Sequence, residues 1–136
     1  MRLVSNHVSH AFARRLESAG VTVAEWVILR ELYDVDALAP SRLAERMGMT
    51  RGAISKLADR LLAKALIERT ADPEDGRAHT LALSVEGLRI VPDLARLADE
   101  NDASFFGHLS TNERTQIEAI LKGIVEKRGL TDIPIG

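Results

Sequence analysis

The chain has 136 residues and a mass of 14.9 kDa, the size of one ordinary domain, which argues against a multidomain enzyme or a long repeat array. Apolar residues make up 46% and charged residues 28%, so we expect a packed core rather than an intrinsically disordered chain. The formal net charge of -2 excludes a strongly basic, histone-like protein and still allows a local basic patch.

The chain contains no cysteine, which excludes disulfides, thiolate metal sites and cysteine nucleophiles. Its longest stretch without a charged side chain, residues 3–13, is interrupted by polar residues and is therefore neither a signal-peptide core nor a membrane span. We expect a cytoplasmic protein with no membrane partner.

The first 33 residues predict two helices. Apolar residues recur at helical spacing from Val4 to Leu16, and Gly20 marks a stop. Thr22 and Glu25 have the spacing of a capping box, in which each side chain bonds the backbone amide of the other. The helix that follows has a wide apolar face, formed by Val23, Trp26, Val27, Leu29 and Leu32. Residues 34–40 are expected to connect to the next element.

Residues 41–61 predict two more helices joined by a tight turn. Gly48 breaks the apolar pattern and suits a turn with positive φ, and Thr50 is a predicted N-cap. The inward residues of the two helices are expected to be Leu43, Ala44, Met47, Ile54, Leu57, Ala58 and Leu61.

The hydrophobic period then changes to two, which predicts strands over 66–71 and 79–84, joined by turn formers in 72–77. A helix over 85–107 should be kinked at Pro92, with apolar residues on two sides that imply burial on both. One side holds Leu88, Val91, Ala95, Ala98 and Phe105, and the other holds Ile90, Leu94 and Leu97. Ser110 and Glu113 form a second capping box, which opens a helix with a predicted buried stripe of Ile117, Ile120, Leu121, Ile124 and Val125.

This element order is typical of a winged helix-turn-helix, a mainly α fold with a small β-hairpin wing. We predict a single domain over 1–136, with a DNA-binding lobe in 21–84 and further helices in 1–20 and 85–136. Apolar helix pairs with an intervening glycine also form simple helical corners, so the spacing alone leaves that interpretation open.

Charge favours a nucleic-acid interface. Residues 41–69 contain seven basic and three acidic residues, a net +4, which leaves -6 for the rest of the chain. A solvated helix surface is the alternative, above all for Arg60 and Lys64. The second helix of the pair should turn a polar face outward, with Asp59 on it and Arg51 or Lys56 donating to guanine. The residues expected to contact double-stranded DNA here are Arg42, Thr50, Arg51, Gly52, Ser55, Lys56 and Arg60.

From Thr22 to about Arg128 the chain resembles a MarR-family winged helix-turn-helix regulator. The signature across the hairpin and the next helix consists of Leu66, Ile67, Glu68, Arg69, Asp72, Asp75, Arg77, Leu81, Leu83, Ser84 and Gly87. The resemblance implies that Arg77 enters the minor groove and that Asp75 orients it, in agreement with the negative potential of a narrow minor groove. Where family members often carry further wing arginines, this sequence has Glu74 and Gly76.

The resemblance also implies a homodimer formed by the terminal helices on a pseudo-palindromic operator, a role as repressor, and release by a small aromatic or anionic effector. Phe12, Arg15 and Trp26 could line an effector pocket, although the two aromatic residues also fit a core position. No cofactor is expected.

Other function classes have weaker sequence support. The chain has neither a Gly-rich phosphate loop nor a serine elbow, so we expect no enzyme. His7 and His10, three residues apart, could bind a metal with His108 or a carboxylate, which would make a metal-responsive regulator of the same fold. A winged helix that binds only protein is a further alternative, which salt-dependent duplex binding would exclude.

Overall fold

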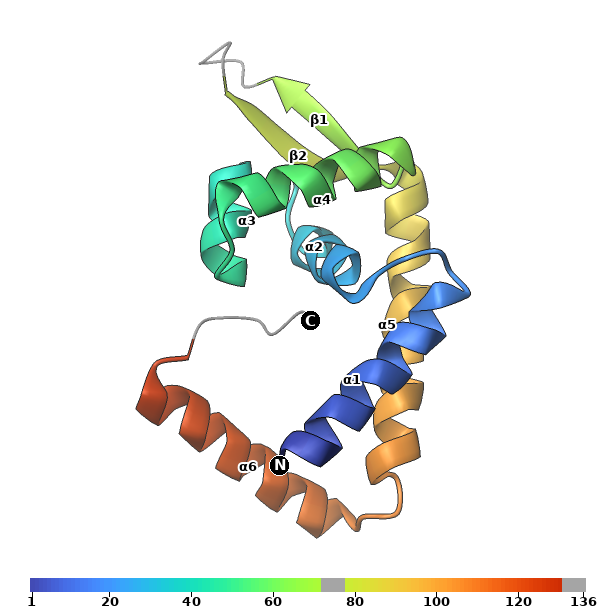
Figure 1. Cartoon of the computed structure of the whole chain (residues 1–136), viewed down its shortest axis with the longest axis vertical. Helices are drawn as coiled ribbons and strands as arrows, with labels where there is room; N and C mark the ends of the chain where they lie inside the picture. The colour runs from blue at the N-terminus through green and yellow to red at the C-terminus, as the bar shows by residue number, and fades with distance from the viewer. Residues whose placement is uncertain (72–77, 131–136) are drawn as a thin grey trace.

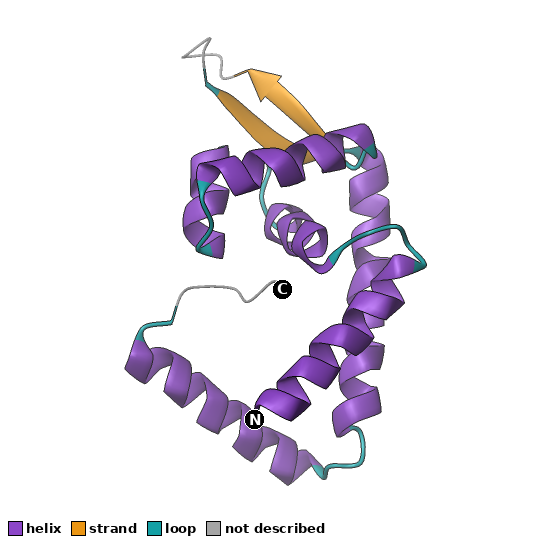
Figure 2. Ribbon diagram, in the orientation of Figure 1, coloured by secondary structure: helices purple, strands orange, loops and turns teal. Residues whose placement is uncertain are grey.

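The computed structural model describes residues 1–71 and 78–130. Within these ranges the chain is mainly helical, as predicted, with one antiparallel hairpin (Figures 1 and 2). The elements are α1 (Arg2–Glu17), α2 (Val23–Tyr33), α3 (Pro40–Met47), α4 (Arg51–Ala63), β1 (Ile67–Ala71), β2 (His79–Leu83), α5 (Val85–Phe106) and α6 (Thr111–Arg128).

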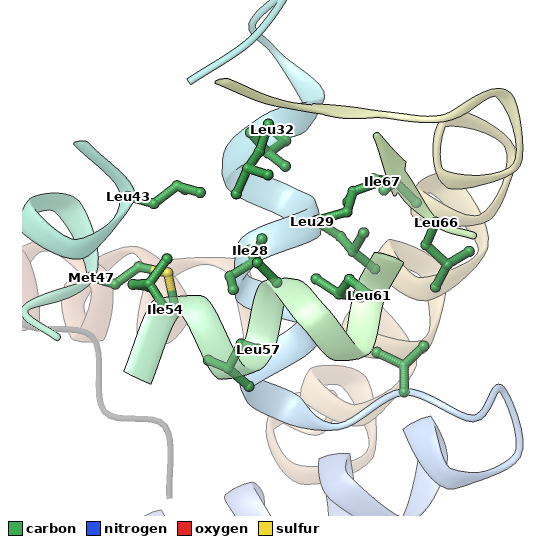
Figure 3. Packing of buried hydrophobic residues seen from close by; sticks show 14 of the residues in the cluster. Ile28, Leu29, Leu32, Leu43, Met47, Ile54, Leu57, Leu61, Leu66 and Ile67 are labelled. Atoms are coloured by element: carbon green, nitrogen blue, oxygen red, sulfur yellow. The ribbon is translucent and has the colours of Figure 1, made fainter. Parts of the chain in front are cut away.

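The core of the lobe forms around α2, on which α3, α4 and the hairpin converge (Figure 3). The predicted inward residues of α3 and α4 are all buried, and Leu29 and Leu32 of α2 meet them. Ile28, which lies outside the predicted apolar face of α2, is fully buried as well. Burial of large aliphatic side chains is the main term that stabilises such a lobe, at about 1.5 to 3 kcal/mol each.

The turn between α3 and α4 has the predicted local chemistry. Gly48 is left-handed, with φ +63°, and the amide of Met49 donates to the carbonyl of Ala44 at 2.9 Å. Thr50 caps α4, its hydroxyl oxygen accepting from the amide of Ala53 at 3.1 Å. Both predicted capping boxes, at the starts of α2 and α6, are present.

The hairpin pairs Ile67 with Leu83 at its base and Ala71 with His79 at its far end. The segment between α2 and α3, predicted as a plain connector, is joined to strand β2 by an isolated β-bridge. Leu38 and Leu81 exchange two backbone hydrogen bonds, of 2.9 and 2.8 Å. This bridge attaches the hairpin to the helical part of the lobe.

The terminal helices form an arm that extends from this core, to which α1 contributes Leu16 and α5 contributes Val91 and Leu94. α1 packs against α5, which continues through Pro92 as one helix (Figure 1). Asn101 of α5 is buried in this contact, at 2% exposure, and its side-chain Nδ2 donates to the backbone carbonyl of Val8 at 3.1 Å. The Nε atom of Arg15 donates to Asn101 Oδ1 at 3.3 Å.

Two predictions about this arm are wrong for the chain on its own. No residue of α6 is buried, and its apolar stripe is 40% exposed at Ile117 and 63% exposed at Ile120. The cause is that α6 turns away from α5 after Gly107 instead of folding back on the core (Figure 1). Leu88 is 49% exposed, so it does not share a buried side with Val91.

Candidate nucleic-acid interface

One face of α4 is polar and open to solvent. The inward row of Ile54, Leu57, Ala58 and Leu61 attaches the helix to the core and leaves its other side free. All the predicted polar residues lie on that free side and are exposed, namely Thr50, Arg51, Gly52, Ser55, Lys56, Asp59 and Arg60.

These residues follow helical geometry in two neighbouring rows. Arg51 and Ser55 are four apart in one row, and Gly52, Lys56 and Arg60 are four apart in the next. The rows begin at the helix N-terminus, where free amides and the helix dipole favour negative charge. The face therefore offers positive charge and hydrogen-bond donors over the length of an exposed helix, as insertion into a major groove requires.

Ion pairs divide the seven basic residues of 41–69 into two groups. Arg46 pairs with Glu31 at 3.2 Å, and Arg42 with Glu45 at 3.4 Å. Lys64 pairs with Glu25 at 2.8 Å, and Arg69 with Asp59 at 3.5 Å. Within the part of the chain that the structure describes, Arg51, Lys56 and Arg60 have no acidic partner.

Three of the seven basic residues therefore remain without an acidic partner among the described residues, and all three lie on α4. Two of the acidic partners, Glu25 and Glu31, lie on α2, outside the basic segment 41–69. The sequence pattern does not predict these two pairs. Burial raises the pKa of Glu25, but hydrogen bonds from Lys64 and Thr22 outweigh this and leave the pKa below its ordinary value. Arg42 remains exposed, and its one acidic partner in residues 1–71 and 78–130 is Glu45 of its own helix, a weak interaction that a phosphate can replace.

The predicted wing contacts fall within residues 72–77. Asp75 and Arg77 lie outside the described residues, as do Glu74 and Gly76. The strands on either side are described, and they pair in register as far as Ala71 and His79.

The residues predicted to bind an effector lie near α1. Phe12 and Trp26 contact each other edge to face, with ring centroids 6.4 Å apart, and both pack against the core. Arg15 lies 3.6 Å from Glu100, in addition to its bond to Asn101. An open groove of about 520 Å³ lies elsewhere, between α5 and α6, and is lined by Asp99, Asp102, Ala103, Phe106, Leu109, Arg114, Ile117, Glu118 and Leu121.

At the edge of this groove, burial raises the pKa of Asp102, and the nearby carboxylate of Asp99 raises it further. His7 and His10 are both exposed, and no cluster of three or more potential metal ligands exists among residues 1–71 and 78–130. A search of the same residues for a helix long and apolar enough to cross a bilayer found none.

Comparisons with known proteins agree with this architecture. A family model described as MarR family matches residues 19–78. The chain is 40% identical over 72 residues to the HTH-type transcriptional repressor MdtR of Bacillus subtilis, an alignment that covers 53% of this chain and 46% of MdtR. It is 30% identical over 112 residues to a putative transcriptional regulatory protein for the hcr operon of Thauera aromatica, covering 82% of this chain and 68% of that protein.

Solved structures match over nearly the whole chain. The S. aureus MepR-DNA complex superposes with a TM-score of 0.81 at 25% identity, covering 93% of both chains. Apo MarR from E. coli superposes with a TM-score of 0.80 at 22% identity, covering 91% of this chain and 93% of that chain, which supports the fold. The chain belongs to the MarR family of winged-helix transcriptional regulators.

Proposed function

We propose that the protein is a homodimeric, sequence-specific DNA-binding repressor that a small-molecule effector releases from its operator. The observation that carries this proposal is the exposed face of α4, where Arg51, Lys56 and Arg60 have no acidic partner among the described residues. Positive charge concentrated on one exposed helix of an acidic chain is typical of a phosphate-binding surface, since counterion release there favours DNA. The likeness to MepR, solved with DNA, supports the same role.

In this mode α4 enters the major groove. Arg51 and Lys56 donate to guanine, and Thr50 and Ser55 supply hydroxyls at the start of the helix. Gly52 leaves the first turn without a side chain, so the helix backbone can approach the DNA closely. Arg42 and Arg60, at the edges of this surface, meet phosphates and set the register of the helix on the duplex.

The hairpin supplies the second contact. Arg77 enters the minor groove next to the operator half-site, and Asp75 holds its guanidinium plane. This part of the proposal depends on the sequence pattern, because both residues lie outside the described ranges.

The terminal helices, residues 1–20 and 85–136, form the dimer. The stripe on α6 from Ile117 to Val125 is exposed in the single chain, and so is Leu3 on α1. Exposed apolar surface of this extent on the terminal helices favours burial against a second copy. A two-fold dimer would present two copies of α4 to half-sites one helical turn apart, about 34 Å.

Release by an effector follows from the same geometry, because a ligand that favours a different lobe spacing lowers operator affinity, and DNA weakens that ligand by the same factor. We propose an apolar or aromatic anion that binds near Phe12 and Trp26. Its counter-charge would be Arg15, which must then leave Glu100. The repressor role is supported by the name of MdtR.

The test of the DNA-reading face uses a duplex that the wild-type chain selects from a random-sequence library. Arg51→Ala and Lys56→Ala should lower the preference for this selected duplex over random DNA, whereas Arg60→Ala should weaken binding to both alike. Arg77→Ala should cost about 1 to 3 kcal/mol of binding with an unchanged circular dichroism spectrum. Equal losses on both DNAs for all the α4 variants would show that the reading face is elsewhere.

Assembly and release need separate measurements. Light scattering should give twice the mass of 14.9 kDa for the wild type, and Ile120→Glu should shift it toward the single chain. Salicylate-like acids titrated into the protein-DNA complex should dissociate it. Dissociation by a metal ion instead would favour a metal-responsive regulator, and a chain that selects no duplex would favour a protein-binding winged helix.

A further inference from the structure

A buried ionic contact joins the end of α4 to the beginning of α2. The side chain of Glu25 is fully buried, and the Nζ atom of Lys64 lies 2.8 Å from each of its carboxylate oxygens. The same ammonium donates to the carbonyl of Gly20 at 2.7 Å. Glu25 Oε1 also accepts from the amide of Thr22 at 2.9 Å, so the carboxylate belongs to the capping box as well.

The ammonium of Lys64 has no donor left for DNA. A lysine ammonium has three N–H donors, and three oxygens occupy them here, those of Glu25 and the carbonyl of Gly20. Charge counting along the sequence includes Lys64 among the seven basic residues of 41–69, and its side chain is 39% exposed. Its contacts separate it from Arg60 of α4, which has no such partner among the described residues.

The segments that Lys64 joins belong to different parts of the fold. Lys64 is the C-cap residue that follows α4, while Gly20 lies in residues 18–22, the connection between α1 and α2. The C-terminal end of α4 and this connection lie on the same side of the lobe (Figure 1). Trp26 follows Glu25 directly and packs edge to face on Phe12 of α1, which extends the contact to the terminal helices.

We propose that Lys64 is a positioning residue that couples the DNA-reading helix α4 to the α1–α2 connection through Glu25 and Gly20, and that it makes no phosphate contact. The inference rests on the proposed function of α4. If α4 moves as it docks on DNA, Lys64 transmits the displacement to the first turn of α2 and to the Trp26 and Phe12 pair. A ligand or partner that moves α1 would act on α4 by the same route.

Salt dependence separates positioning from phosphate binding. We measure affinity for the selected duplex across a salt series for the full-length wild type, Lys64→Met and the control variant Arg60→Met, which alters a residue proposed to meet phosphate. Lys64→Met should bind about fivefold or more weakly with the wild-type salt slope, since no counterion is released at this residue. Arg60→Met should lower the slope by about one. A slope that falls equally in Lys64→Met would make Lys64 a phosphate contact and overturn the proposal.

Fluorescence of Trp26, the one tryptophan of the chain, tests the coupling itself. Binding of the selected duplex should change its emission in the wild type and change it much less in Lys64→Met. Unchanged emission in the wild type on DNA binding would overturn the coupling. An Arg60→Met variant without any effect on binding would count against the proposed DNA-binding surface of α4 and not against Lys64.

Removing Lys64 alone leaves a buried carboxylate without its partner and can unfold the lobe. The double variant Glu25→Gln with Lys64→Met removes both charges, and its denaturation midpoint should return close to that of the wild type. Its DNA affinity and Trp26 response should stay reduced, because the link is still missing. Full recovery of both readouts in the double variant would show that the pair only stabilises the fold.

Discussion

The end of α4 allows one substitution whose effect on stability follows from backbone geometry. Among the described residues Ala65 is the one non-glycine with a positive φ, at 60°. Its amide donates to the carbonyl of Leu62 at 3.0 Å, and the amide of Leu66 donates to the carbonyl of Leu61 at 3.0 Å. These two bonds form a Schellman motif, which places a left-handed residue directly after the helix and is usually completed by glycine.

The magnitude follows from two opposing terms. A left-handed conformation costs an L-residue with a Cβ about 1 to 2 kcal/mol, and Ala65→Gly removes this cost from the folded state. Glycine also has more backbone freedom than alanine in the unfolded chain, and this entropy stabilises the unfolded state by about 0.5 to 1 kcal/mol. We therefore expect Ala65→Gly to raise the free energy of unfolding by about 0.5 to 1 kcal/mol, which raises Tm by about 2 to 4 °C.

Urea and thermal unfolding, followed by far-ultraviolet circular dichroism, measure this change. The denaturant midpoint should rise while the m-value stays constant, since the surface exposed on unfolding is the same. Ala63→Gly is the matched control, because Ala63 is the last helical residue of α4 and is also exposed. In a helical position the same replacement should cost about 1 kcal/mol. If both variants lose stability alike, α4 does not end in a left-handed residue and the reasoning is refuted.

Three further predictions concern glycines and pH. Gly52→Ala should raise the free energy of unfolding by about 0.5 to 1 kcal/mol, because a Cβ there meets only Thr50 Oγ1 at 4.0 Å. The same variant should bind DNA more weakly, and a gain in both stability and affinity would refute the close approach of the α4 backbone to DNA. Gly87→Ala should destabilise by about 1 to 3 kcal/mol in urea, because its Cβ would lie 2.1 Å from the carbonyl oxygen of Leu66, and a neutral effect would contradict this packing of α5 on the hairpin. Glu25 has a folded pKa below its ordinary value of 4.5, so its charge stabilises the fold above that pH, and the contribution is lost as the pH falls through the folded pKa. The stability difference between wild type and Glu25→Gln should therefore shrink in acid, and a constant difference would show that the carboxylate is not paired.

Local chemistry along the chain was sufficient for the helices, the hairpin and the exposed face of α4. Thr22 with Glu25, Ser110 with Glu113, and the capping residue Thr50 all bond partners three residues away, so their spacing alone indicates the contact. Apolar periodicity likewise predicted which side of α4 turns inward, because helical spacing places every third or fourth residue on one face. The DNA-reading residues proposed for this helix could thus be named from the sequence, although their role stays a prediction.

The tertiary structure decided which charges remain available and which surfaces remain open. Lys64 and Glu25 are 39 residues apart, and no periodicity along the chain indicates that they meet. Leu38 likewise pairs with Leu81 only because the fold brings the α2–α3 segment against the hairpin. The stripe on α6 has the same pattern as a core helix, and only the direction of the chain after Gly107 leaves it exposed. Sequence patterns report interactions within about one helical turn or one strand pair, whereas ion pairing and burial depend on which distant segments pack together.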